Sequence, residues 1–239
     1  GSITFKGKLG NVVGRMVNGT PVIQTLGGFT SENLRKGRKK QYARVFENAN
    51  EFAYSTNLAK AIHYIPDASI HKTHHGNHAF QKLISKIHQL RTLDAQNPRG
   101  QRRPTTDTLK YLVPHQFNPP AALTIRTKLT YVETDPENLS ISLTDPLNNL
   151  LWPDSASGVE LIAYTASHDP DLQRVTQQER RSQVLLFEAA DQDLALTAPL
   201  LPSRSLLIVA IRFYQVLGDL IYPLADASFS PMQIGYWKE

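Results

Sequence analysis

The chain has 239 residues, of which 41% are apolar, and it contains no cysteine. This composition excludes collagen-like, disordered and disulfide-stapled classes of protein. The longest uninterrupted apolar run, 206–211, is far shorter than the roughly 20 residues that a bilayer span needs, so no membrane insertion is expected. A folded chain of this length buries roughly 70–75% of its unfolded surface, which supports one or two domains without metal or disulfide.

The net charge of +5 conceals an asymmetry along the chain. Residues 1–103 carry 17 basic and 5 acidic side chains, whereas residues 104–239 carry 9 basic and 16 acidic ones. The change of sign coincides with a polar stretch, 97–106, that contains two prolines and a glycine. We therefore expect an N-terminal domain over residues 1–103 and a C-terminal domain over residues 104–239.

The N-terminal segment has the pattern of β-structure. Ile3, Phe5 and Leu9 fall on one side of an alternating pattern. Asn18-Gly19 then separates two β-rich runs, and this pair tolerates the positive φ angles that a tight hairpin turn requires. The sequence predicts a β-hairpin here, with the proline at position 21 on an edge strand.

Two amphipathic helices are predicted next. The first begins near Thr30 or Ser31 and ends before Pro66, and the second begins near Asn77. The apolar stripe of the first helix comprises Leu34, Tyr42, Val45, Phe46, Ala49, Phe52, Ala53 and Thr56. The stripe of the second comprises Phe80, Leu83, Ile84, Ile87 and Leu90.

From residue 109 onward the pattern changes to short strands separated by turn residues. The expected strands are 123–133, 139–144, 159–166, 183–188, 194–198, 206–217 and 227–236. About seven strands in about 130 residues is typical of a β-sandwich of immunoglobulin-like architecture, although the Cys and Trp hallmarks of antibody domains are missing. The expected fold class is α+β, with an N-terminal β-hairpin and amphipathic helices followed by an immunoglobulin-like antiparallel β-sandwich.

The opening segment carries a recognisable motif. Residues 7–14 read Gly-Lys-Leu-Gly-Asn-Val-Val-Gly and are followed by the Asn18-Gly19 turn and Val22-Ile23. This resembles the start of a bacterial domain-of-unknown-function family whose members begin with Gly-Lys-x-Gly-Asn-Val-Val-Gly and end in an all-β region. The resemblance covers about the first 26 residues, and Met16-Val17 stands where the family has an aromatic-basic pair. It implies a secreted or surface role and no catalytic residues.

Histidines are concentrated in the middle of the N-terminal half. His71 with His75, or His74 with His78, has the i, i+4 spacing with which two imidazoles on one helix face can share a metal ion. Gly76 interrupts that helix, and no carboxylate or thiol lies within the cluster to complete a site. We interpret it as a polar loop whose histidines face solvent, and we expect neither a metal site nor a cofactor. The cluster comprises His63, His71, His74, His75, His78 and His88.

A basic run occupies the predicted first turns of the first helix, where cations oppose the helix macrodipole. A compensating contact is therefore expected, either with solvent, with nucleic acid or with an acidic protein surface such as the C-terminal half of another copy. Nucleic acid is disfavoured because the only nearby aromatic, Tyr42, belongs to the apolar stripe. The charge-complementary contact is assigned to Arg35, Lys36, Arg38, Lys39, Lys40 and Arg44.

Motifs of catalysis are missing from the sequence. Gly7, Gly10 and Gly14 match neither a dinucleotide-binding fingerprint nor a phosphate loop, and no G-x-S-x-G elbow occurs. Asp pairs such as Asp169 with Asp171 have turn chemistry and lack the further ligands of a calcium loop. We therefore expect a protein that is not an enzyme and takes no small-molecule substrate.

The leading hypothesis is a secreted subunit that polymerises head to tail into an extracellular, pilus-like filament by sharing β-strands between copies. A short hairpin is marginal alone, and a neighbouring sheet could cover it while alternate side chains fill pockets. The C-terminal segment 229–237 is another possible donor, and the same N-terminal segment could instead pair within its own chain. The expected donor residues are Ile3, Phe5, Leu9, Val12, Val13, Val17, Val22 and Ile23.

Two alternatives remain open. The first is a monomeric adhesin that binds a glycan or a protein through exposed aromatics such as Trp152, Tyr164 or Trp237, although Trp152 could equally be a core residue. The second is a nucleic-acid-associated or phage-like structural component, which rests on the basic run.

Overall fold

The structure is a computed structural model. It describes residues 6–10, 12–17, 19–25, 43–74, 76, 78–122, 125, 128–169, 174–201, 204–218 and 220–238. The chain divides into two compact units, Gly1–Ala49 and Asn50–Glu239. Within the second unit, the helices that precede residue 103 share a core with the sheet that follows them.

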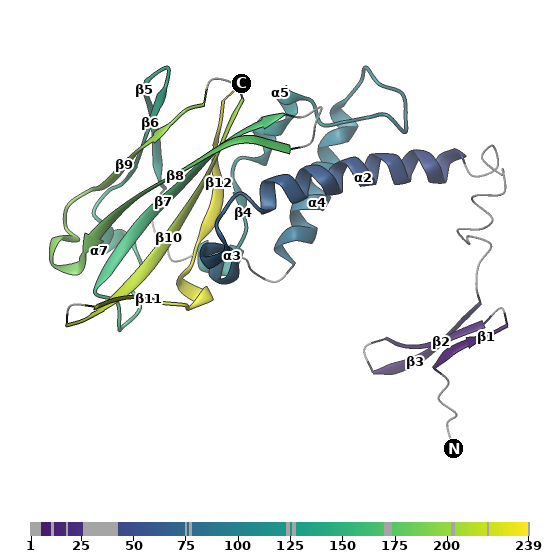
Figure 1. Cartoon of the computed structure of the whole chain (residues 1–239), viewed down its shortest axis with the longest axis horizontal. Coiled ribbons are helices and arrows are strands. Elements are labelled where there is room, and N and C mark those ends of the chain that lie inside the picture. Colours follow the sequence, from purple (N-terminus) through teal and green to yellow (C-terminus); the bar gives the residue numbers. More distant parts are fainter. Residues whose placement is uncertain are drawn as a thin grey trace. The chain divides into compact units, whose positions relative to one another are not determined.

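The first unit contains an antiparallel three-stranded meander (Figure 1). Its strands are β1 (Gly7–Leu9), β2 (Val12–Val17) and β3 (Thr20–Thr25), in the order β1-β2-β3. Val17 pairs with Thr20 across the predicted turn, where Gly19 has a φ of 81°. The turn and the edge position of the proline in β3 were thus predicted correctly, whereas the additional strand β1 makes a meander of the expected hairpin.

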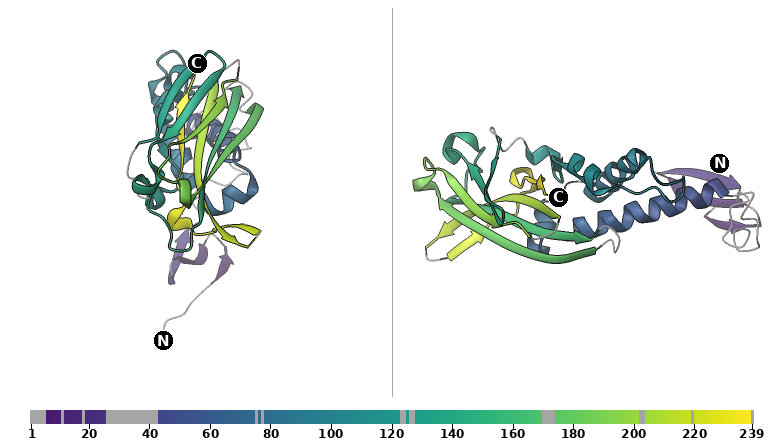
Figure 2. Two further views of the ribbon diagram at one scale, coloured as in Figure 1. Left: turned by 90° about the vertical axis from the view of Figure 1, so that its left-hand side faces the viewer. Right: turned by 90° about the horizontal axis from the view of Figure 1, so that it is seen from above.

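Three helices open the second part of the fold: α2 (Ala43–His63), α3 (Ala68–His74) and α4 (Ala79–Leu90). Helix α2 packs against α4, where Ser55 Oγ lies 3.2 Å from His88 Nδ1 (Figure 2). The predicted stripe of the second helix is confirmed, since Leu83, Ile87 and Leu90 are buried and the other two members pack against the same core. Helix α2 ends before Pro66, as expected.

The predicted stripe of the first helix was wrong over the part that the structure describes. Phe52 is 52% exposed and Val45 lies at the surface. The buried face is rotated and comprises Glu51, Tyr54, Ser55, Leu58, Ala59, Ile62 and His63. Polar members of this face are stabilised by specific partners: Arg91 and the Gly100 N–H both contact the Glu51 carboxylate. The predicted start of this helix, near residues 30–31, lies outside the described residues.

Two antiparallel sheets follow. The larger has the strand order β4-β12-β10-β7-β8, with β11 paired to β10, and the smaller has the order β5-β6-β9 (Figure 1). The strands are β4 (His115–Gln116), β5 (Thr130–Asp135), β6 (Asn138–Leu143), β7 (Gly158–Asp169), β8 (Arg174–Leu186), β9 (Leu194–Pro199), β10 (Ser205–Leu217), β11 (Leu220–Pro223) and β12 (Met232–Trp237). Helices and antiparallel sheets together confirm the α+β class.

Short helical turns connect these strands. The α-helical ones are α5 (Thr106–Leu109), α6 (Pro119–Ala122) and α7 (Pro146–Asn149). The 3-10 turns are η1 (Arg91–Leu93), η2 (Lys110–Leu112), η3 (Phe187–Ala189) and η4 (Ala227–Phe229). The last two replace the ends of predicted strands 183–188 and 227–236, which are therefore shorter there than expected.

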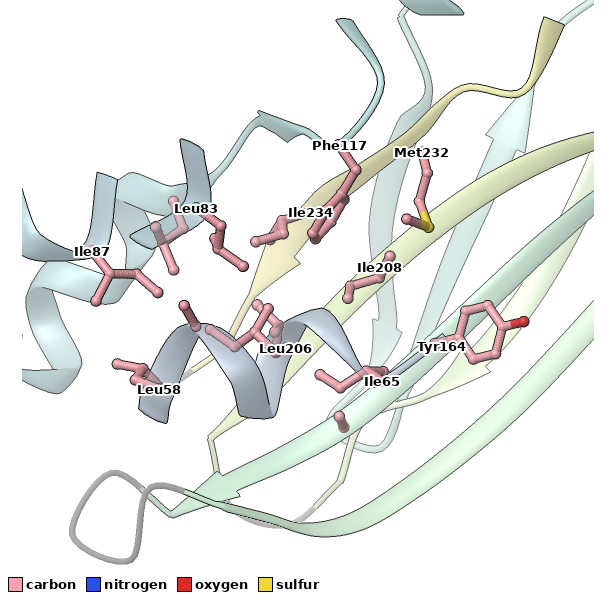
Figure 3. Close-up of a cluster of buried hydrophobic side chains, with 14 of the residues drawn as sticks. Leu58, Ile65, Leu83, Ile87, Phe117, Tyr164, Leu206, Ile208, Met232 and Ile234 are labelled. Atoms are coloured by element: carbon pink, nitrogen blue, oxygen red, sulfur yellow. The ribbon is translucent and has the colours of Figure 1, made fainter. Parts of the chain in front are cut away.

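The central strands β7 and β10 of the large sheet are buried on both faces. On β10, Leu206, Ile208 and Ala210 pack with the helices, whereas the residues between them pack with the small sheet. Strand β7 alternates in the same way over residues 161–164, which explains why apolar residues follow one another in both strands. Figure 3 shows the helix-side core, in which Leu58 and Leu83 from the helices meet Leu206 and Ile234 from the sheet.

Candidate functional site

The meander of the first unit has one predominantly apolar face. Antiparallel pairs place Leu9 beside Val12 and Ile23 beside Gly14, and residues two apart in a strand share a face. We call this set the apolar face; its side chains are Leu9, Val12, Met16, Pro21 and Ile23. Leu9 is 71% and Ile23 68% exposed, so the described residues place no second layer over these two side chains.

The opposite face of the meander is mixed. It carries Val13, Val17 and Val22, interspersed with Lys8 and Arg15. The structure thus separates the predicted donor residues into two sets, and it assigns Leu9, Val12 and Ile23 to the apolar face. Ile3 and Phe5 lie outside the described residues.

The basic run can be placed only in part. Arg44 is exposed in the first turn of α2. The other five cations, Arg35, Lys36, Arg38, Lys39 and Lys40, lie outside the described residues. Their expected contact with an acidic surface stays a prediction.

A second feature of interest is the outer edge of β12 in the second unit. Strand β4 covers this edge only where Gln116 and His115 pair with Gln233 and Ile234, and the Phe117 N–H extends the contact to the Met232 carbonyl. Beyond Ile234, Tyr236 and Trp237 pair with β10 on one side but with no described strand on the other, and Gly235 lies at an irregularity of the ladder between them and Ile234. An unpaired strand edge presents N–H and C=O groups that can accept an additional strand.

A cavity of about 440 Å³ lies at this edge. Its wall combines apolar side chains with two glutamines, one lysine and a tyrosine. It is lined by Val113, Pro114, Gln116, Ile125, Lys128, Leu129, Tyr131, Gln233 and Gly235. We call this cavity the edge pocket. Its volume suits one or two apolar side chains.

Tyr131 and Gly235 define the shape of the edge pocket. A Cβ atom at Gly235 would overlap the Tyr131 ring and hydroxyl, so only glycine allows this close approach between β5 and β12. Gln233 Nε2 donates to Tyr131 Oη at 2.9 Å. Burial raises the pKa of Tyr131 to about 12, so at neutral pH its hydroxyl is a neutral hydrogen-bonding group and not a base.

Acidic side chains stand beside the same edge. The hairpin between β5 and β6 carries Glu133, Asp135 and Glu137, all of them exposed. Tyr236 donates a hydrogen bond to Glu133, and Lys238 Nζ donates to the Pro136 carbonyl at 2.6 Å. These contacts hold the acidic hairpin against the end of β12 whose outer edge is unpaired.

The histidine cluster differs from its predicted exposure. His63 is buried and its ring centroid lies 4.5 Å from that of His71, and His74 is fully buried with Nε2 2.8 Å from the Ile211 carbonyl oxygen. Burial lowers the pKa of both His63 and His74 to about 4, so both are neutral at pH 7. The prediction of solvent-facing histidines was wrong for these two, because they pack between the helices and at the helix–sheet contact. His75 lies outside the described residues.

The most extensive buried ionic network centres on Glu160 in β7. Its carboxylate accepts hydrogen bonds from Arg180 and Arg212 and from the Tyr214 hydroxyl. Burial alone would raise the pKa of Glu160, but the hydrogen bonds from Tyr214 and Arg212 lower it. Every donor belongs to a neighbouring strand, so the network links β7, β8 and β10. We call it the structural tie, because it connects the three strands.

A second carboxylate connects this network to the helices. Asp67 caps α3 by accepting from the Ser69 and Ile70 N–H groups, and it also accepts from the Tyr164 hydroxyl at 2.6 Å. Burial would raise the pKa of Asp67, but the hydrogen bonds from Ser69, Tyr164 and Ile70 lower it to about 2. Asp67 therefore fixes helix α3 to the sheet.

Of the aromatics considered for an adhesive surface, Tyr164 is buried and Trp152 is half-buried. Trp152 donates to the Pro146 carbonyl at 2.9 Å and packs edge-on to Phe187 and Phe213. Trp152 thus serves the core, and Trp237 packs beside the helix-side core.

The residues of the edge pocket were not predicted. Strand β4 is only two residues long and gives no alternating pattern, and Tyr131 and Gln233 are far apart in the sequence. The one available signal was Gly235, an isolated glycine within an alternating strand, which indicates close approach of another group.

Comparisons of the chain with protein-family models, curated proteins and solved structures found no match. Among the described residues, no helix combines the length and apolarity that crossing a bilayer requires. Within the same part of the chain, no three His, Cys, Asp or Glu side chains are grouped so that they could hold a metal ion.

Proposed function

We propose that this protein is a structural subunit that assembles with copies of itself into an extracellular fibre by sharing β-structure between subunits. The observation that carries the proposal is the apolar face of the meander, on which Leu9 and Ile23 are more than two-thirds exposed. A small sheet gains independent stability only when a hydrophobic face is covered. A neighbouring subunit would provide that cover.

The geometry of sharing favours a filament. The apolar face belongs to the first unit, and the unpaired edge of β12 belongs to the second, so the two surfaces are different. A contact between unlike surfaces is heterologous and propagates into a ring or an open filament. The basic N-terminal and acidic C-terminal halves are complementary in charge, which favours the same head-to-tail order.

We also propose that the two packed sheets form an immunoglobulin-like sandwich, that the chain is a member of the bacterial family its first residues resemble, and that it acts outside the cell or at its surface. The shared core between β5-β6-β9 and β7-β10 supports the sandwich. Helices on the second face of the large sheet are an addition to that architecture. The buried carboxylates are occupied by structural contacts, which supports a role other than catalysis.

A binding module is the second candidate, and the edge pocket is the observation that favours it. A cavity of about 440 Å³ with apolar walls and convergent polar groups has the dimensions of a small-ligand site. This candidate predicts a monomer that binds its ligand reversibly, whereas the fibre predicts concentration-dependent assembly.

The size of the full chain at micromolar concentration separates the two candidates. We expect light scattering and negative-stain microscopy to show regular assemblies in low and in high salt, because strand sharing does not depend on charge attraction. A monodisperse species near 26.8 kDa under all conditions would exclude self-assembly and favour the binding module.

Substitutions on the two faces of the meander provide matched variants. Leu9→Ser and Ile23→Ser each remove an exposed apolar side chain worth roughly 1–2 kcal/mol on burial, so each should weaken association about tenfold. Val17→Ser is the control, because Val17 is also exposed but lies on the opposite face. Equal loss of assembly in all three variants would contradict the assignment of the apolar face.

A further inference from the structure

The outer edge of β12 is a built acceptor for an additional strand. The ladder with β4 stops at Ile234. On the other side of β12, Tyr236 and Trp237 still pair with β10 after an irregularity at Gly235, so β10 holds the end of the strand in place. The edge pocket lies beside this stretch and is lined by residues from both sheets, including Gly235 and Tyr131. A strand added there would gain backbone hydrogen bonds and a cavity for a side chain.

The other end of the large sheet lacks these properties. Its edge strand, β8, is exposed along most of its length and carries Glu179, Arg180 and Arg181 in succession. Charged side chains on an edge strand oppose pairing with further strands. The sheet therefore has one protected edge and one partly open edge with an adjoining cavity.

We propose that the partly open edge of β12 is the acceptor site for the N-terminal segment of a second copy, with the apolar side chains of residues 2–9 directed into the edge pocket. This inference rests on the proposed function and names the surface that receives the shared strand. Ile3, Phe5 and Leu9 alternate along this segment, and such alternation directs one side chain in two toward the pocket.

Charge supports this choice of occupant. The residues that alternate with the apolar ones include Lys6 and Lys8, which would point away from the pocket. The acidic hairpin, with Glu133, Asp135 and Glu137, lies beside the same end of β12. A segment with apolar residues on one side and lysines on the other thus meets an apolar cavity and a row of carboxylates.

The natural chain has no cysteine, so engineered disulfides report this contact without background. The probe is a synthetic peptide with the sequence of residues 1–10 and the substitution Ile3→Cys, which places the thiol on the side of the segment that faces the pocket. The full-length acceptor carries Lys128→Cys, at an exposed residue that lines the edge pocket. The matched control carries Gln183→Cys, at an exposed position on β8. We expect at least about tenfold more cross-linking to the Lys128→Cys protein, with competition by unmodified peptide.

Full-length chains then test whether the strand comes from another copy. The double variant Ile3→Cys with Lys128→Cys should form a ladder of disulfide-linked oligomers on a non-reducing gel. Only intramolecular disulfides would overturn the proposal, because the segment would then occupy its own edge.

Failure of this inference is distinguishable from failure of the proposed function. Equal cross-linking of the peptide to both cysteine positions would overturn the assignment of β12 as the acceptor edge. If the unmodified protein nevertheless forms regular assemblies, the fibre would stand and the shared strand would be accepted by another surface. Preferred cross-linking at Lys128→Cys together with a strictly monomeric wild-type chain would support β12 as the edge that accepts the segment, but it would overturn both the supply of that segment by a second copy and the fibre.

Discussion

His74 predicts a specific dependence of stability on pH. Its imidazole is fully buried, Nε2 donates to the Ile211 carbonyl oxygen at 2.8 Å and Nδ1 lies 2.6 Å from Thr73 Oγ1. Burial lowers the pKa of His74 to about 4, against 6.5 for an ordinary histidine, and Arg212 acts in the same direction while Asp67 opposes it. The folded state therefore holds this ring in its neutral form.

The sign and size of the effect follow from proton linkage. Between pH 6.5 and about 4 the unfolded chain binds a proton at this position that the folded chain does not, so stability falls as the pH falls. A pKa near 4 instead of 6.5 corresponds to about 3 kcal/mol over that range. His63 and His115, whose pKa values burial also lowers to about 4, add to the loss.

The variant His74→Gln isolates the contribution of this ring, because glutamine offers an N–H to the same carbonyl and does not titrate. Urea unfolding at pH 7 and pH 4 should show that the wild type loses about 3 kcal/mol more than the variant. Equal losses in the two proteins would refute the reasoning. Should the variant fold poorly, an NMR titration that places the pKa of His74 near 6.5 would refute it as well.

Three further sets of substitutions test the packing. Glu160→Gln removes the buried charge from between its two arginine partners, so urea unfolding should show a loss of about 3–5 kcal/mol; a loss below about 1 kcal/mol would contradict the proposed tie. Gly235→Ala should cost about 1–3 kcal/mol because its Cβ overlaps Tyr131, and adding Tyr131→Ser should recover most of this; strictly additive losses would point to another cause. Leu58→Ala should cost about 2–5 kcal/mol, whereas Phe52→Ala should change stability by less than about 0.5 kcal/mol, and similar losses would contradict the observed face of α2.

The strands were predictable where burial is one-sided or complete. Strands β6 and β9 alternate with period two, as in Leu139, Ile141 and Leu143, and β10 is a long apolar run. Helix α4 was predictable for the same reason, because its apolar residues follow a single stripe. In each case the apolar pattern within the element is sufficient to predict which residues are buried, whichever elements pack against them.

Features that depend on distant partners were not predictable. The buried face of α2 includes Glu51 and His63, which resemble surface residues until the partners that satisfy them are known. The core that the helices share with the large sheet is likewise a property of packing and not of composition. The edge pocket likewise arises where a two-residue strand, β4, stops short of its neighbour.

The double burial of β10 has a consequence for how its register is fixed. In a sheet with one solvent-exposed face, a slip of one residue would turn the apolar side chains toward water, and the free-energy cost of that exposure disfavours the slip. On β10 such a slip would only exchange the side chains of Ile208 and Val209 between two dry cores. The burial of apolar side chains therefore does not disfavour that slip. The pairing of Arg212 with Glu160 does disfavour it, because in the shifted register a buried charge would lose its partner. The ion pair thus specifies the register of β10 relative to β7.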